Sequence, residues 1–467
     1  MHNSQAPSWS ELLSGRNGLR SLALAGGVAL HAVNMYVVTT ILPSVVADIG
    51  GLEYYAWNLT LFVAASILGS ALSPKIIDSW GVRTGFLVAI AVFSAGTTGC
   101  ALAPSMPWML LARTVQGLGG GMLLGLSYAS VRLVFEERLW PLAMVLVSSM
   151  WGVATLGGPA VGGIFAQTGH WRLAFWSILP GCAVLALLVV TQLSRSAGRT
   201  GQRSRPPLGK IALLVLTVMV VSVSSLSQAL VWNALGVLGG ILVAALIVRM
   251  DLHAKGRLLP AGSYRIGGVL GSAYACICLL SIGATTEIYI PYFLQLIHGQ
   301  SPLMAGYWTA ILSVGWTTGS FISSRRAGAV AGRFILAGPL MSAASLALLA
   351  VLMPLSGLSA GDRTAWVLLV PLMGVGLGIG LCWPLLLTRV FKASPPGQEN
   401  IGSAAITTLQ LFAMAMGAAV AGMVANAAGF TDPGGLEGTQ SAARALFVVV
   451  ACAPALAAIL SRGARRA

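Results

Sequence analysis

Charge is scarce in this sequence: only 8% of its 467 residues are charged, whereas 57% are hydrophobic. A soluble globular domain carries about 25% charged residues, so the composition excludes a soluble protein. The apolar residues form long uninterrupted runs, and runs of about 20 residues indicate membrane spans. Acidic residues are especially few, 12 against 27 basic ones, which leaves a net charge of +15.

Motifs of catalysis, redox chemistry and nucleotide binding are missing as well. The six cysteines lie within apolar runs and form no C-x-x-C pair, so nothing indicates a disulfide framework. Neither the phosphate-binding string of an ATP-driven pump nor an H-E-x-x-H zinc motif occurs. Basic residues are scattered in small groups instead of gathered on one segment, so we expect no nucleic-acid partner. We also expect no cofactor and no metal.

The apolar sequence is long enough for fourteen crossings of a bilayer. The run at 211–250 is about twice the length of one span and has basic residues on both flanks, so it must cross an even number of times. We place the turn of this central hairpin at Trp232 and Asn233. The predicted spans are 20–47, 56–77, 85–103, 108–134, 141–165, 172–194, 210–230, 232–250, 268–297, 303–326, 332–354, 364–391, 399–429 and 441–462.

The distribution of lysine and arginine predicts the orientation of these spans. With the N-terminus in the cytoplasm, most of the 27 basic residues fall in cytoplasmic loops. Arg172, Arg363 and Arg444 lie on the other side, and Arg113 lies inside a span. We therefore predict a multi-pass protein of the plasma (inner) membrane with both termini cytoplasmic. The first apolar run is too long for the core of a signal peptide, so we expect no cleavage.

The predicted loops are short, so the function must lie within the bilayer. A channel would show a repeated filter or a charged ring, and an enzyme would need a constellation of acids, bases or ligands. One long chain with varied helices favours a secondary transporter with alternating access. A membrane-embedded enzyme is the remote alternative. Two glycine-rich strings, Gly117–Gly121 and the alternating glycines of 374–380, lie within apolar helices and favour close helix packing over nucleotide binding.

Two ionisable residues lie well inside spans, where they are candidates for function. Glu287 lies roughly 16 Å from the span end at His298, at 1.5 Å per residue. A charge at mid-membrane costs about 2.5–3.5 kcal/mol, so a carboxyl there can bind a proton on one side and release it on the other. The alternative is a protonated glutamic acid that only packs. Arg113 keeps its charge, shares a helix face with Gln116 at i+3, and either joins two helices or takes part in proton movement.

Polar and aromatic residues in the first, fourth and ninth spans are candidates for the substrate cavity. In the ninth, Pro291 interrupts the helix, and the neighbouring tyrosine rings suit a cation or a flat organic compound. In the first, His31 and Asn34 share one face. Interhelical hydrogen bonding is the alternative role of these groups, and for His31 packing is favoured over proton transfer. The candidates are His31, Asn34, Tyr36, Gln116, Tyr289, Tyr292 and Gln295.

Three strings resemble motifs of the major facilitator superfamily. The first follows the second span and is similar to the D-R-x-G-R-R loop at Asp78, Gly81 and Arg83. The second runs from Arg113 to Gly119, includes Gln116, and matches R-x-x-Q-G-x-G. The third, in the fifth span, resembles the antiporter motif G-P-x-x-G-G and consists of Gly152, Gly157, Gly158, Pro159, Gly162 and Gly163.

Two further stretches resemble the fourteen-helix drug:proton antiporter branch of that family: Trp171-Arg172 with Phe175, and the string from Ile290 to Gln295. The resemblance implies an all-α membrane protein of fourteen transmembrane helices, with two six-helix bundles and a central two-helix insertion. The implied boundaries are a cytoplasmic segment 1–19, a bundle 20–194, basic loops with the inserted helices 195–267, a bundle 268–462, and a basic tail 463–467.

The resemblance also implies proton-coupled export of amphipathic organic compounds, driven by the proton gradient and without a cofactor. Glu287 would be the proton site and Arg113 its modulator, while Asp78, Gly81 and Arg83 would support the conformational switch. Many members of the branch carry an acid where Asn34 stands here. The implied partners are protons, a small organic substrate and the lipid bilayer, with the protein acting as a monomer. The alternative is an exporter or proton symporter of a specific endogenous metabolite or lipid.

Overall fold

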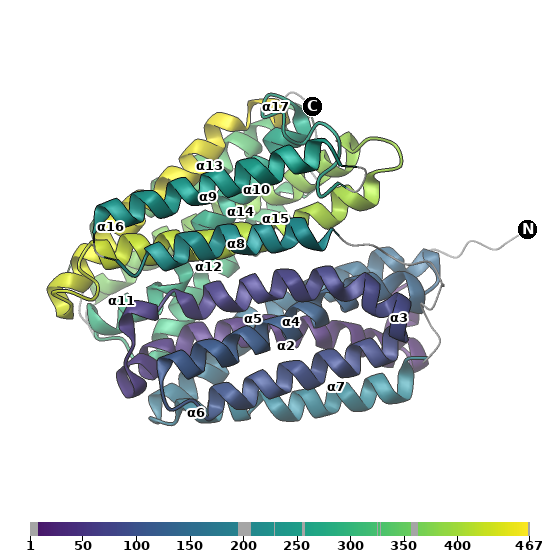
Figure 1. Ribbon diagram of the computed structural model, residues 1–467, viewed down its shortest axis with the longest axis horizontal. Coiled ribbons are helices and arrows are strands. Elements are labelled where there is room, and N and C mark those ends of the chain that lie inside the picture. The colour runs from purple at the N-terminus through teal and green to yellow at the C-terminus, as the bar shows by residue number, and fades with distance from the viewer. Residues whose placement is uncertain are drawn as a thin grey trace, which may run out of the picture. The chain divides into compact units, whose positions relative to one another are not determined.

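The computed structural model describes residues 8–194, 207–227, 229–254, 257–324, 326, 328–355 and 363–465. Within these ranges the secondary structure consists of helices joined by short connections (Figure 1). The chain divides into two compact units. Unit 1 comprises Met1–Val38 and Leu61–Leu208, and unit 2 comprises Thr39–Thr60 and Gly209–Ala467. Parts of the predicted segments 1–19, 195–267 and 463–467 lie outside the described residues, and the predicted domain boundaries stay predictions.

Unit 1 contains the helices of the first half of the chain. Two of them, α2 and α3, continue into unit 2, because the division of the chain falls within each of these helices. The elements are α1 (Trp9–Leu13), α2 (Gly15–Ile49), α3 (Trp57–Ala101), α4 (Met106–Val134), η2 (Glu137–Leu139), α5 (Trp140–Gln167), α6 (Trp171–Trp176) and α7 (Ile178–Gln192).

Unit 2 contains the ends of α2 and α3 with the short helix η1 (Leu52–Tyr54), together with the helices of the second half. In this half, Pro291 and Pro302 stand in the first turns of their helices, where the missing amide proton costs nothing. The elements are α8 (Leu208–Ser224), α9 (Leu230–Leu252), α10 (Val269–Ala284), η3 (Thr285–Ile288), α11 (Ile290–Leu296), α12 (Pro302–Ser323), α13 (Gly328–Leu352), η4 (Arg363–Leu368), α14 (Leu369–Ala393), α15 (Glu399–Ala427), α16 (Gly435–Leu460) and α17 (Arg462–Arg465).

Among the described residues, 11 helices are long and apolar enough to cross a membrane. The chain is therefore a multi-pass membrane protein, but length and hydropathy do not support the predicted count of fourteen. The difference falls in three places. The segment Leu52–Ala101 counts once although the sequence predicts two spans there, α8 has only 17 residues, and the polar content of α12 keeps it out of the set.

Helix α3 is interrupted at Gly81, within the loop that the sequence analysis singled out. Its 45 residues are two helices merged across a kink, because Gly81 adopts φ 78° and ψ 166°. This region of backbone space is essentially restricted to glycine, since a Cβ would clash with the chain. Asp78 and Arg83 flank the kink and are both half-buried.

Close packing of glycine-rich helices builds the core of each unit. A Cβ on Gly117, Gly119 or Gly121 of α4 would overlap backbone atoms of α3, and Ser66 donates a hydrogen bond to the carbonyl of Gly117 at 2.9 Å. In unit 2, the glycines at 376 and 380 face the backbone of α12 in the same way. The packing role predicted for both glycine strings is thus confirmed.

The central hairpin turns earlier than predicted. Helix α8 ends at Ser224 and α9 begins at Leu230, so Trp232 and Asn233 lie in the first turn of α9 and not in the connection. The Asn233 side chain donates to the carbonyl of Ser227 at 3.1 Å. Asparagine here satisfies the backbone of the serine-containing turn, which explains a polar residue beside the turn instead of within it.

Candidate functional site

A chain of buried hydrogen bonds joins three helices of unit 1. Arg113 of α4 donates to the side-chain oxygen of Gln116, one turn later on the same helix. Gln116 in turn donates through Nε2 to Oδ1 of Asn34 on α2 and to Oγ1 of Thr97 on α3, both at 2.9 Å. Each of the four side chains is at most 1% exposed. The predicted shared face of Arg113 and Gln116 on α4 is confirmed, and Asn34 of α2 bonds to that face.

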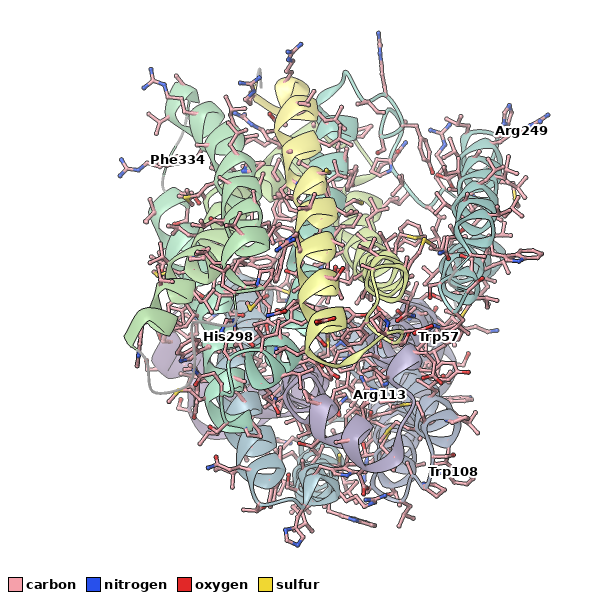
Figure 2. All side chains as sticks on the ribbon, turned by 90° about the vertical axis from the view of Figure 1, so that its left-hand side faces the viewer. Trp57, Trp108, Arg113, Arg249, His298 and Phe334 are labelled. Carbon is pink, nitrogen blue, oxygen red and sulfur yellow. The ribbon has the colours of Figure 1, made fainter. Side chains whose placement is uncertain are left out.

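Aromatic rings cover the guanidinium and the neighbouring imidazole of this unit. The Arg113 guanidinium carbon lies 4.1 Å from the centre of the Phe62 ring, a cation–π arrangement. The His31 ring lies 5.2 Å from the same phenyl ring and 5.9 Å from Trp151, centre to centre. Arg113 is 1% exposed and lies among the helices of its unit (Figure 2). This surrounding keeps the charge out of contact with lipid.

The antiporter motif on α5 has two kinds of glycine. Gly158 is buried against α2, where a Cβ would overlap Cβ of Tyr36. Gly152 and Gly157 face open space, because no other part of the described chain comes within 4 Å of a Cβ placed on either glycine. Pro159, Gly162 and Gly163 are buried in the same helix. Close helix contact therefore explains part of the motif, and its outward-facing glycines are free to serve another purpose.

Glu287 of unit 2 lies in a short 3-10 segment between two α-helices. Helix α10 ends at Ala284, the 3-10 segment η3 carries Glu287, and α11 begins at Ile290. The Glu287 side chain is half-buried, and within the described part of the chain its carboxyl forms no hydrogen bond and no salt bridge. An intramembrane carboxyl with this surrounding is not committed to a structural partner.

An aromatic cluster of unit 2 adjoins the Glu287 segment. Tyr55, from the connection between α2 and α3, donates its hydroxyl to the carbonyl of Ile288 at 3.1 Å. Its ring lies 5.0 Å from Tyr289 and 5.4 Å from Tyr292, while Phe430 packs against all three. We call these four residues the tyrosine cluster. The predicted cavity residues Tyr289 and Tyr292 thus lie together, with Tyr289 only 1% exposed.

A second cluster ties the two helices of the central hairpin together. Lys210 at the start of α8 and Asp251 at the end of α9 form a buried salt bridge of 2.6 Å. The same carboxylate accepts hydrogen bonds from the backbone of Leu258 and Leu259 and from the Tyr264 hydroxyl. Burial and the hydrogen bond to Asp251 raise the pKa of the Tyr264 phenol above its ordinary value.

Sequence reasoning missed Phe62, Thr97, Tyr55, Phe430 and Asp251. Only Asp251 carried a signal, because it lies 41 residues after Lys210 at the other end of a hairpin, and antiparallel helices bring such ends together. The rings and hydroxyls lie on distant segments with no motif around them. Gln295 is half-buried on α11, and its Nε2 has no hydrogen-bond partner among the described residues.

Comparison with known proteins reveals relatives over nearly the whole chain. A probable multidrug-efflux transporter of Mycobacterium tuberculosis is 36% identical over 467 residues, covering 97% of this chain and 96% of the relative. The multidrug efflux pump SdrM of Staphylococcus aureus is 24% identical over 296 residues, with 62% and 65% coverage.

Solved structures show the same fold at low sequence identity. A bacterial homologue of the human lysosomal transporter Spinster, in an inward-facing and unoccupied conformation, matches with a TM-score of 0.64 at 15% identity over 97% of both chains. A POT family transporter in complex with a thioalcohol-conjugated peptide matches with a TM-score of 0.68 at 14% identity. These matches cover 97% and 95% of this chain, so they support one fold for all of it.

The model of the Major Facilitator Superfamily matches residues 24–418. That range includes Arg113, Glu287 and the glycine motif of α5. Members of this family are transporters, so the chain is not an enzyme and its partner is a small molecule. The chain belongs to the Major Facilitator Superfamily.

Proposed function

We propose that this protein is a drug:proton antiporter of the fourteen-helix branch, which exports amphipathic organic compounds across the plasma membrane. The near full-length relative from Mycobacterium tuberculosis, a probable multidrug-efflux transporter, supports the export of such compounds. The family provides the mechanism class, in which two halves of the chain alternate access to a central site. The protein acts as a monomer, with both termini in the cytoplasm.

The state of Glu287 is the observation that carries proton coupling. Its carboxyl lies at the break between α10 and α11, half-buried and without a structural partner among the described residues. Hydrogen bonds to the carboxylate or a neighbouring cation would stabilise the charged form and make it harder for the carboxyl to bind a proton. Glu287 has no such contact among the described residues, so its carboxyl can bind a proton when it is shielded from water and release the proton when it is exposed. A proton moving with the membrane potential supplies about 2.3 kcal/mol per 100 mV.

Arg113 acts in this proposal as an electrostatic modulator of the transport cycle. Its guanidinium is buried, keeps its charge and is held by Gln116 and the Phe62 ring. Asp78, Gly81 and Arg83 form the conformational switch, since the kink at Gly81 separates two helices that can then tilt independently. The outward-facing glycines Gly152 and Gly157 allow another helix to approach α5 during that motion.

Fourteen crossings are part of the proposal. The two halves of α3 on either side of Gly81 each have enough residues for one crossing, as the glycine kink divides them. Helix α12 is 22 residues long, and α8 pairs with α9 through the Lys210–Asp251 bridge. Counting α3 twice and adding α8 and α12 to the long apolar helices restores the predicted topology, which places both termini on one side.

Dye efflux in a host that lacks its own efflux pumps tests the proposed function. Cells that express the protein should extrude an amphipathic dye and tolerate higher drug concentrations, and a protonophore should abolish both effects. Efflux that persists without a proton gradient would contradict proton coupling. Uptake instead of extrusion would favour the symporter alternative, and absence of any drug or dye phenotype would favour a dedicated metabolite or lipid exporter.

A further inference from the structure

The hydrogen-bond chain of unit 1 has a fixed polarity. Arginine carries only donors, so the Arg113 guanidinium must face the oxygen of the Gln116 amide. The amide nitrogen of Gln116 is therefore turned toward its other two neighbours, and it donates to Oδ1 of Asn34 and to Oγ1 of Thr97. Thr97 already directs its own hydroxyl to the Phe93 carbonyl at 2.7 Å, which leaves its oxygen as the acceptor for Gln116.

This direction of the hydrogen bonds determines which group of the Asn34 amide is available to a ligand. Its carbonyl oxygen is occupied by Gln116, so its free group is the amide nitrogen, a donor of two hydrogens. Asn34 is 0% exposed, and its Nδ2 has no hydrogen-bond partner among the described residues. Buried donors are rarely left without an acceptor, so an unsatisfied one requires an explanation.

The side chains around Asn34 suit a flat organic compound. His31 lies one turn earlier on the same face of α2, and its ring is set between Phe62 and Trp151. Gly120 makes room for this ring, because a Cβ there would come within 2.9 Å of the His31 Nδ1. The Arg113 cation at the other end of the hydrogen-bond chain favours electron-rich groups nearby.

We propose that Asn34 Nδ2 binds a hydrogen-bond acceptor of the substrate, so that the protein selects aromatic compounds with a carbonyl or carboxylate group over permanent organic cations. This inference rests on the proposed export function and specifies its substrate class. An aspartate at position 34 would offer only acceptors and a negative charge, which is the opposite chemistry. The asparagine thus determines which charge the preferred substrate can carry.

Equilibrium binding to the purified protein in detergent tests this assignment without requiring transport. The probes share one ring system: 2-naphthoate, its methyl ester, and the naphthyl-trimethylammonium cation. The wild-type protein should bind the first two at least about 10-fold more tightly than the cation, as a lost partner of a buried polar group costs on this order. Asn34→Asp should reverse the order, and Asn34→Leu should weaken the acceptor probes without strengthening the cation.

Asn233→Asp provides the matched control, because this asparagine is also buried but lies in the central hairpin, outside the hydrogen-bond chain. Its order of affinities should equal that of the wild-type protein. Equal wild-type affinity for the cation and the ester would overturn the inference, as would unchanged ester affinity in Asn34→Leu. Binding in the expected order without efflux from cells would refute the export function and leave the assignment of Asn34 intact.

Discussion

Replacement of Asp251 by alanine should weaken the contact between α8 and α9 in the central hairpin more than the replacement of any surface charge. The Asp251 carboxylate is 1% exposed and accepts a 2.6 Å bond from Lys210, whose side chain is 9% exposed. It also accepts two backbone bonds, of 2.6 and 3.3 Å, and one of 2.9 Å from Tyr264. Removal of one partner of a buried ion pair costs about 3–5 kcal/mol, because the other charge remains buried.

Two further variants separate the parts of this loss. Lys210→Met leaves Asp251 with its three remaining donors, so we expect a smaller cost of about 1–3 kcal/mol. Lys210→Met combined with Asp251→Ala should be less destabilised than the sum of the single variants, because the buried lysine that lost its carboxylate is removed as well. Since the Tyr264 pKa is raised, its bond to Asp251 is fully present below pH of about 10 and is lost only at higher pH.

Thermal unfolding in detergent, followed by tryptophan fluorescence, measures these differences, and hydrogen exchange of peptides from α8 and α9 localises them. Arg138→Ala is the control, as this arginine bridges Glu11 and Glu136 at the surface with 42% of its side chain exposed. Exposed pairs contribute little, so we expect no measurable change there. If Asp251→Ala unfolded at the same temperature as Arg138→Ala, the buried bridge would not hold the hairpin.

Three other predictions concern a tyrosine hydroxyl bond, the packing of α5 and the kink in α3. Tyr55→Phe removes the hydroxyl bond to the Ile288 carbonyl but keeps the ring, so the pH dependence of dye efflux should shift while expression stays normal; an unchanged pH profile would dissociate Tyr55 from the Glu287 segment. Gly158→Ala should lower the unfolding temperature, because the new methyl overlaps Tyr36, whereas Gly157→Ala should fold normally; equal stability of the two would contradict the packing at α5. Gly81→Ala should reduce expression and efflux together, because its backbone conformation excludes a Cβ, and wild-type efflux would argue against a kink there.

The sequence predicted contacts within one helix well. The i+3 spacing of Arg113 and Gln116 placed them on one face, and their hydrogen bond forms as expected. Proline positions were equally informative, since Pro291 stands in the first turn of α11, after the break at Glu287. Helical geometry fixes both results locally, so a single sequence suffices.

Contacts between segments far apart in the sequence could not be predicted from residue spacing. Asn34 lies 82 residues from Gln116, and Tyr55 lies 233 residues from Ile288, so neither partner follows from periodicity. The hairpin turn predicted at Trp232 and Asn233 lies a few residues earlier, and the Asn233 side chain bonds to it from within α9. The number of crossings differed in three places, because α3 counts once despite its kink at Gly81, α8 has only 17 residues, and α12 is not apolar enough to count.

Coupled transport by Glu287→Gln in proteoliposomes tests the central claim most directly. Glutamine keeps the size of the side chain but cannot exchange a proton, and Glu437→Gln on the exposed start of α16 controls for the change itself. We expect the wild-type protein and the control to move protons when substrate is added and to accumulate substrate against its gradient. Glu287→Gln should still bind substrate but move no protons and accumulate nothing. Proton-coupled accumulation at the wild-type rate in Glu287→Gln would contradict the account.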